Sequence, residues 1–209
     1  MAFTFFFRDL HVLELIVQHV VPSFAGRTFV RIWDAGCAAG QETYTLAILL
    51  AEHMNHFAFN NVRIYATDID ESGDFGRTVR EGVYRREELE RVPAELVSQY
   101  FEPGPEPGFL RVVERLRARV VFQRHDLLSL QPIGYGFSLI LCKNVLLHFR
   151  PEQQVEVVRM FHQALAPGGY FATEHTQKLP ASLAPLFRPV VAGAQLFQKI
   201  GLDDACAAA

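Results

Sequence analysis

Runs of apolar residues alternate along this chain with stretches in which apolar positions recur every three or four residues. Residues 28–35 and 137–142 are runs of the first kind, which is typical of buried strands. Residues 42–54 are of the second kind, which is typical of an amphipathic helix. Because the two kinds follow one another in turn, the pattern predicts an α/β fold, a doubly wound and mostly parallel sheet covered by helices.

The alternation of strands and helices continues along the rest of the chain except at residues 82–123. It predicts helices at 9–21, 42–54, 71–80 and 151–165, and strands at 28–35, 62–67, 137–142, 170–173 and 194–200. Between residues 82 and 123 the rhythm changes to short helices, a proline/glycine loop and an expected hairpin of 109–113 with 119–122. We therefore expect one domain over 1–209, with an inserted antiparallel β-subdomain at about 82–123.

Composition narrows the class of protein. Apolar residues make up 50% of the chain, charged residues 21%, and the net charge is −3, so a globular domain without a bias toward nucleic acid is expected. No apolar run is long enough for a membrane-spanning helix, and residues 1–9 are too short for a secretory signal. The scattered residues Cys37, Cys142 and Cys206 predict reduced, buried thiols and no metal site. A cytoplasmic enzyme or binding domain, with no membrane insertion, fits best.

The strand–turn–helix around residues 32–42 carries the strongest chemical signal. The small residues Ala35, Gly36 and Cys37 would let a ligand approach the backbone at the carboxyl end of the sheet. The turn lacks the third glycine of a dinucleotide fingerprint. Glu42 would repel a pyrophosphate but suits a cationic ligand, such as an amino group or a sulfonium. A tight turn with no ligand would also explain this segment taken alone.

Polar residues follow other predicted strands as well. Asp68 closes the second strand, where nucleoside-binding α/β folds place a carboxylate on the ribose hydroxyls. It could instead cap a helix, although Asp70 could do that equally well. Asp126-Leu127 and Lys143-Asn144 stand in equivalent places after later strands. If the strands are parallel, all these sites meet at one edge of the sheet.

The chain here resembles the chemotaxis-receptor glutamate O-methyltransferases of the CheR type, from Thr4 to about Ile200. The resemblance rests on the ordered segments Thr4-Phe5-Phe6-Phe7-Arg8, residues 33–45, Ala66-Thr67-Asp68-Ile69-Asp70, Gly82-Val83-Tyr84, Gln99-Tyr100-Phe101, Asp126-Leu127-Leu128 and residues 141–149. It implies a class I methyltransferase-like sheet with an antiparallel last strand. The cofactor implied is S-adenosyl-L-methionine, with S-adenosyl-L-homocysteine as product.

The resemblance also implies a role for each part of the pocket. Thr4 and Arg8 would cover the methionine end of the cofactor, and Glu42 would hold its amino group. Asp68 would bind the ribose hydroxyls. Asp126 and Leu127 would border the adenine. Lys143, Asn144 and Val145 would complete the wall of the pocket.

The transfer itself needs little acid–base chemistry, because a glutamate acceptor with an ordinary pKa of about 4.3 is already an anion at neutral pH. Arg8 could orient that carboxylate, although taken alone it could also be a surface arginine. His148 stands where the family usually has an aromatic hydroxyl near the acceptor. It could donate a hydrogen bond there or be a packed histidine at a helix start. Lys143 replaces the family's arginine and keeps the charge without the planar fork.

The substrate is the most open point. The family commonly has a helical N-terminal domain before Thr4, so a divergent member lacking that domain is expected. Arginines around the inserted subdomain could attract an acidic, chemoreceptor-like helix, or belong to a mixed-charge surface with their neighbouring glutamates. Three functions therefore compete: a protein-glutamate O-methyltransferase, a methyltransferase for a small molecule or another protein group, and a non-catalytic S-adenosylmethionine-binding signalling module.

Overall fold

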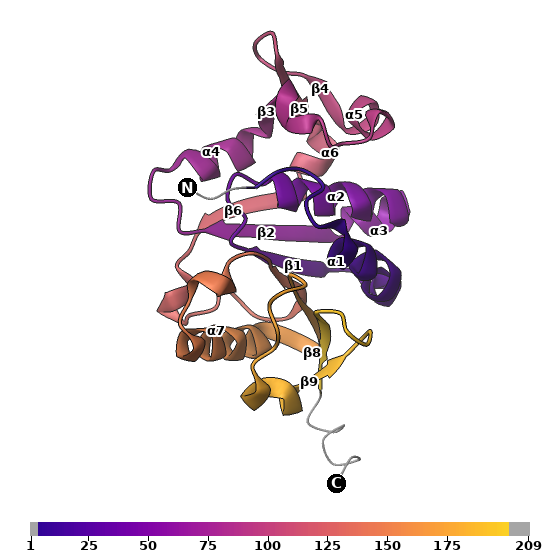
Figure 1. The fold of residues 1–209 in the computed structure, drawn as a ribbon. Helices are drawn as coiled ribbons and strands as arrows, with labels where there is room; N and C mark the ends of the chain where they lie inside the picture. The colour runs from indigo at the N-terminus through magenta and orange to yellow at the C-terminus, as the bar shows by residue number, and fades with distance from the viewer. Residues whose placement is uncertain (1–3, 201–209) are drawn as a thin grey trace.

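A seven-stranded sheet organises the protein (Figure 1), whose computed structural model describes residues 4–200. Its strands, in spatial order, are β6 (Val120–Arg124), β2 (Val62–Asp68), β1 (Val30–Ala35), β7 (Phe137–Cys142), β8 (Leu165–Thr173), β10 (Leu196–Lys199) and β9 (Phe187–Pro189). The first five run parallel, and β10 runs antiparallel to both of its neighbours. The predicted doubly wound, mostly parallel sheet with an antiparallel last strand is confirmed.

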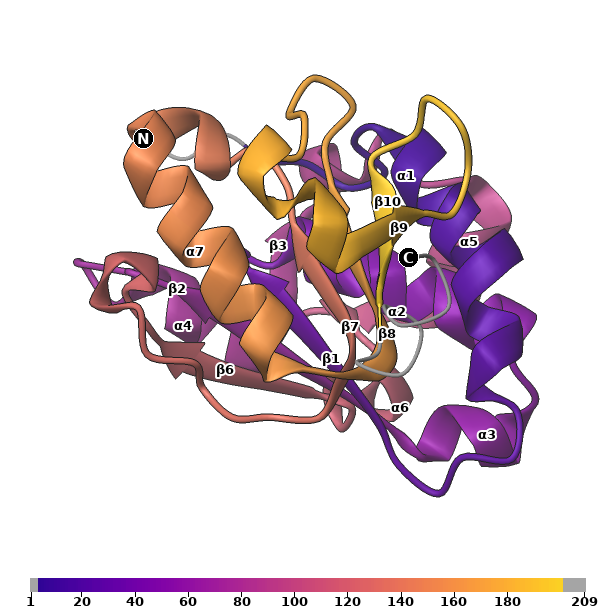
Figure 2. The same cartoon turned by 90° about the horizontal axis from the view of Figure 1, so that it is seen from below.

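Helices cover both faces of this sheet. They are α1 (Leu10–Leu15) with its continuations Ile16–Val20 and Val21–Phe24, α2 (Gln41–His53), α3 (His56–Asn60), α4 (Asp74–Glu81) and α7 (Pro151–Ala164). Successive side chains of a strand point to opposite faces, so in β1 Ile32 joins the core under α2 and Trp33 joins the core under α7. Figure 2 shows α7 on the side of the sheet opposite to α1 and α3.

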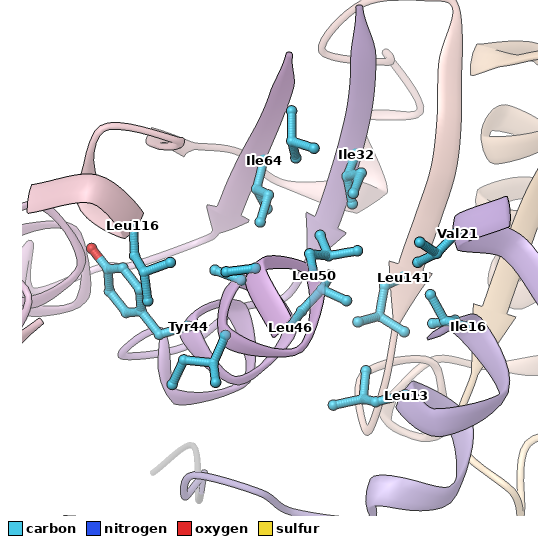
Figure 3. Close-up of a cluster of buried hydrophobic side chains, with 14 of the residues drawn as sticks. Leu13, Ile16, Val21, Ile32, Tyr44, Leu46, Leu50, Ile64, Leu116 and Leu141 are labelled. Carbon is cyan, nitrogen blue, oxygen red and sulfur yellow. The ribbon is translucent and has the colours of Figure 1, made fainter. Parts of the chain in front are cut away.

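The core under α1 and α2 fixes the position of both helices (Figure 3). Leu13, Ile32, Leu46, Leu50 and Leu141 are fully buried there and come from four different elements. Burying each such side chain contributes about 1.5–3 kcal/mol. This packing holds the first turn of α2 against the end of β1, where the site lies.

A second, three-stranded antiparallel sheet occupies the predicted insertion. It consists of β3 (Val83–Arg85), β5 (Phe109–Val112) and β4 (Phe101–Pro103), accompanied by the helices Arg86–Leu89, α5 (Ala94–Tyr100) and α6 (Glu114–Arg117). In Figure 1 it projects above the main sheet.

The predicted hairpin of residues 109–113 with 119–122 is wrong. β5 pairs with β3 and β4, whereas β6 pairs in parallel with β2 as an edge of the main sheet. The short helix α6 separates the two strands and redirects the chain. Because β6 is an edge strand and is partly exposed, its residues look in sequence like one arm of a hairpin.

Two helix boundaries also differ from expectation. The helix expected over 71–80 begins only at Asp74, because Gly73 before it adopts a left-handed φ of +80°. The helix expected over 9–21 loses its regular α geometry after Leu15. None of the helices within residues 4–200 has the length and apolar character needed to cross a membrane. Cys37 and Cys142 are buried free thiols as predicted, and Cys206 lies outside the described residues.

Candidate active site

A cavity of about 520 Å³ opens at the carboxyl edge of the parallel strands. Among the residues that line it are nearly all of those singled out in the sequence: Thr4, Arg8, Gly36, Cys37, Glu42, Asp68, Asp126, Leu127, Lys143, Asn144, Val145 and His148. Ala35 is the exception, because it is the last residue of β1 and is fully buried behind the lining. The residues that follow the strands therefore lie together at one edge of the sheet, as predicted.

The turn after β1 exposes its backbone to the cavity. The amides of Gly36 and Cys37 both donate to the Thr67 carbonyl, at 2.7 and 2.9 Å, which folds the turn against β2. Gly36 adopts φ +92°, and a Cβ there would lie 2.2 Å from Cγ2 of Val145. Only glycine meets both conditions without strain. The absence of a side chain at Gly36 lets the turn lie in direct contact with Val145 in the loop after β7.

The side chain of Asp68 faces the cavity from the end of β2. Its Oδ2 accepts the Ala38 amide at 2.9 Å, and its Oδ1 accepts the Asp70 amide at 3.3 Å. Asp70 performs the capping function, since its carboxylate accepts the amides of Phe75 and Gly76 at the start of α4. The alternative interpretation of Asp68 as a helix cap is therefore not what the structure shows.

Glu42, in the first turn of α2, forms an ion pair with Lys143. Its Oε2 lies 2.8 Å from Nζ of Lys143, whose side chain is fully buried. Burial raises the pKa of Glu42, although the neighbouring Lys143 opposes that rise. Lys143 Nζ also donates to the carbonyls of Arg8 and Asp9, at 3.3 and 3.4 Å. One ammonium group thus joins α2, the loop after β7 and the N-terminal segment.

Two further buried carboxyl groups lie behind this pair, and the sequence did not single them out as site residues. Asp34 in β1 accepts a hydrogen bond from the Thr43 hydroxyl, and its burial, reinforced by the charge of Glu42, raises its pKa to about 8. Glu174 follows β8, and its Oε2 accepts the Asn144 amide at 2.9 Å and the Thr173 hydroxyl at 2.8 Å. Glu174 therefore holds Asn144 in its left-handed conformation, φ +57°, at the cavity wall.

The N-terminal segment is anchored to the small sheet and to α2. The buried Phe6 ring packs edge-on against Tyr84 and Phe101, with centroid distances of 4.9 and 5.6 Å. The Phe7 amide donates to the Thr45 hydroxyl at 3.0 Å. These contacts, with Lys143, hold the segment that carries Arg8 at the cavity. The small sheet thereby contributes to the site through the packing of Phe6.

The mouth of the cavity is partly apolar. Ile69, Leu128 and Leu147 line it and remain exposed, and His148 beside them is also exposed. His148 is therefore not the packed histidine that one interpretation offered. These three apolar residues were not among the predicted site residues, although Ile69 directly follows Asp68 and Leu128 directly follows Leu127, and those positions could have indicated them.

The arrangement suits a cationic nucleoside ligand of the size of S-adenosylmethionine. Two carboxylates, Glu42 and Asp68, face one cavity at different points, and exposed apolar side chains at its mouth can cover a base. Within residues 4–200 no group of three or more histidine, cysteine or carboxylate side chains is placed to hold a metal ion. The two carboxylates and the apolar mouth fit the cofactor that the resemblance implies.

Known proteins of one family match most of this chain. A family model described as CheR methyltransferase, SAM binding domain, matches residues 2–192. Chemotaxis protein methyltransferase 2 of Pseudomonas aeruginosa is 34% identical over 83% of this chain and 62% of its own length. The chemotaxis protein methyltransferase of Escherichia coli is 32% identical over 83% of this chain and 60% of its own. The chain thus spans about three fifths of these relatives.

Solved structures resemble this chain in fold at low sequence identity. The rRNA methyltransferase aviRa of Streptomyces viridochromogenes superposes with a TM-score of 0.57 at 15% identity, covering 100% of this chain and 88% of that one. The family model matches residues 2–192, which is most of the chain. The chain belongs to the family of CheR methyltransferase S-adenosylmethionine-binding domains.

Proposed function

We propose that this domain catalyses methyl transfer from S-adenosylmethionine to a glutamate side-chain carboxylate of a chemoreceptor-like protein. The observation that supports it most is the meeting of Glu42 and Asp68 at one cavity that Arg8 and His148 also line. When bound, S-adenosylmethionine supplies a methyl group on a sulfonium, which a carboxylate oxygen can attack.

The chain's own residues would hold the cofactor as follows. Glu42 accepts hydrogen bonds from the amino group of the cofactor. The Asp68 carboxylate already accepts the Ala38 and Asp70 amides, and its remaining lone pairs accept the ribose hydroxyls. Asp126 and Leu127 border the adenine, with one Asp126 oxygen already accepting the Leu128 amide at 2.8 Å. The turn at Gly36 and Cys37 allows close approach of the ligand to the backbone. Thr4 covers the methionine end.

Lys143, Asn144 and Val145 would act differently from one another. Lys143 neutralises Glu42 and positions the N-terminal segment through the Arg8 and Asp9 carbonyls. Asn144 is fixed by Glu174, and Val145 closes the wall against Gly36. Lys143 therefore contributes to the site chiefly through its contacts with other residues.

Acceptor activation in this proposal is a matter of orientation. The glutamate acceptor is ionised at neutral pH and needs no general base. Arg8 pairs with the carboxylate, and His148 donates a hydrogen bond to it from the mouth of the cavity. The N-terminal segment excludes water from the reacting atoms. Holding the two reactants in line supplies most of the acceleration in such a site.

A second candidate keeps the reaction and changes the acceptor. The exposed Leu147 beside His148 favours it, because an apolar mouth suits a small molecule or another protein group better than an acidic helix. A non-catalytic S-adenosylmethionine-binding signalling module is the outcome if the cofactor binds and no methyl group moves.

Supplying cofactor with a radiolabelled methyl group separates these possibilities. The protein is incubated with a chemoreceptor cytoplasmic domain, with the same domain carrying Glu→Gln changes at its acidic positions, and with small carboxylic acids. The proposal expects label on the unchanged receptor domain that is released as methanol by mild base. Base-stable label, or label only on the small acids, supports the second candidate. Cofactor binding without label on any acceptor supports the signalling module.

A further inference from the structure

The opposite edge of the main sheet carries a row of arginines in register. Arg31 on β1 is paired with Arg63 on β2. The next pair along, Ile64 with Val120, places Arg119 beside Arg63, and the Ile64 amide donates to the Arg119 carbonyl at 2.8 Å. Neighbouring strands lie about 4.8 Å apart, so the backbone positions of the three arginines follow one another at about that spacing. The active-site cavity lies at the other end of these strands.

Each arginine of this row donates a hydrogen bond to a backbone carbonyl, and the Arg31 guanidinium also lies over the rings of Tyr65 and Phe137, 5.1 and 4.8 Å from their centroids. Arg31 donates to Tyr135 at 2.7 Å, Arg63 to Ala118, and Arg119 to Asn60. A guanidinium has five N–H donors. The Nε atoms of Arg31 and Arg119 are buried, so the capacity left for a ligand lies in the terminal Nη groups. No ion pair joins any of the three to a carboxylate among residues 4–200. Like charges opposite one another on adjacent strands are destabilising, so an anionic partner bound to this row would relieve their repulsion.

The surroundings of the row are basic and aromatic. Segments 25–31, 53–63, 118–121 and 131–137, which form this edge, contain no aspartate or glutamate and add Arg27 to the positive charge. Phe29, Phe57 and Tyr135 project from them with 78%, 82% and 63% of their surface exposed. The neighbouring acidic residues are engaged elsewhere, Glu52 by the Tyr100 hydroxyl and Glu114 by Arg117. Figure 1 shows α3, which carries Phe57, at the end of the sheet away from the loop between β2 and α4.

We propose that this edge, defined by Arg31, Arg63, Arg119, Phe29 and Phe57, docks an acidic segment of a partner protein. The Cβ atoms of residues at positions i and i+4 of a helix lie about 5–6 Å apart, close to the spacing of the strands that carry the arginines. The planar fork of each arginine suits a carboxylate, and the exposed rings offer contact to apolar side chains of the same segment. A long polyanion such as RNA is disfavoured because the whole chain has a net charge of −3.

A binding experiment on the full chain tests the proposal. The probe is a fluorescein-labelled 18-residue helical peptide with Glu at i and i+4 and two Leu on the adjoining face. A peptide with Gln at the Glu positions and a single-stranded RNA 12-mer are compared with it. We expect the Glu peptide to bind most tightly, with an affinity that falls as salt rises. The R63Q and F29S/F57S variants should each weaken it about fivefold or more.

Matched variants make the result decisive. R77Q removes an exposed arginine outside the edge, where Arg77 pairs with Asp74, and should leave peptide binding unchanged. R63K, which keeps charge without the fork, should lie between R63Q and the original protein. Circular dichroism and S-adenosylhomocysteine binding should be unaffected in all variants. Equal binding of the Glu and Gln peptides, equal effects of R63Q and R77Q, or tighter binding of the RNA would each overturn the proposal.

Discussion

The ammonium of Lys143 lies 2.8 Å from the Glu42 carboxylate and shares its remaining donors between the backbone carbonyls of Arg8 and Asp9. The residue proposed to grip the cofactor and the segment proposed to orient the acceptor are thus joined through one buried charge. A change at Lys143 therefore affects both parts of the site together.

Replacing Lys143 with Met should destabilise the protein strongly. The variant leaves Glu42 buried without its partner, which typically costs about 3–5 kcal/mol in the free energy of unfolding. Urea unfolding of K143M, E42Q and the double variant would measure this, and the double variant should lose less than the sum of the two. Additive losses would show that the pair contributes nothing beyond its separate residues.

Gly36→Ala should destabilise the fold and displace Val145 in the cavity wall. The new Cβ would overlap Val145 and require a positive φ, together costing about 2–4 kcal/mol. Gly26→Ala is the matched control, because Gly26 has φ +74° and no atom within 4 Å of the added Cβ. Val145→Ala in the G36A background should recover part of the loss, as measured by thermal unfolding. Equal losses for G36A and G26A would contradict the predicted overlap.

Asp34 should make stability depend on pH. Its pKa is raised to about 8 in the folded state from an ordinary 3.8, so the native protein holds a proton that the unfolded chain has released between these values. The free energy of unfolding should therefore fall as pH rises from about 4 to about 8. Asp34→Asn removes this titration. Urea unfolding at several pH values should show a flatter profile for D34N, and an unchanged slope would rule out the assignment.

His148→Phe should slow methyl transfer while leaving cofactor affinity unchanged. The variant keeps an aromatic ring at the cavity mouth and removes the hydrogen bond proposed to reach the acceptor, worth about tenfold in kcat. His148→Tyr restores a hydroxyl donor and should retain more activity than H148F. If H148F changed only KM for the acceptor, His148 would be a contact residue without a part in orientation.

Much of the fold follows from periodicity. β7 is apolar over nearly its whole length, and β1 and β2 are rich in apolar residues although charged residues interrupt them. α2 has a helical repeat, so these elements and their parallel arrangement could be predicted. β6 could not, because an edge strand that is half exposed carries the alternation of a hairpin, and only its pairing with β2 distinguishes the two. The choice of partner strand is a tertiary property that local sequence does not encode.

The site was predictable where its residues follow strands. Asp68 ends β2, and Glu42 lies in the first turn of the helix that follows β1, and the cavity has both in its lining. The pairing of Glu42 with Lys143, and the support of Asn144 by Glu174, join residues far apart in the sequence, so no spacing rule would find them. The exposure of His148 likewise depends on how the loop after β7 lies, which its sequence leaves open.

The most direct test of the central claim is calorimetric titration of the full chain with S-adenosylhomocysteine, comparing the unchanged protein with D68N and D70N. Asp68 faces the cavity, whereas Asp70 caps α4, so the two neighbouring changes separate ligand binding from structure. We expect one binding site, an affinity about 10–100-fold weaker in D68N, and no change of affinity in D70N. Absence of binding by the unchanged protein, or equal affinity in D68N, would contradict the account.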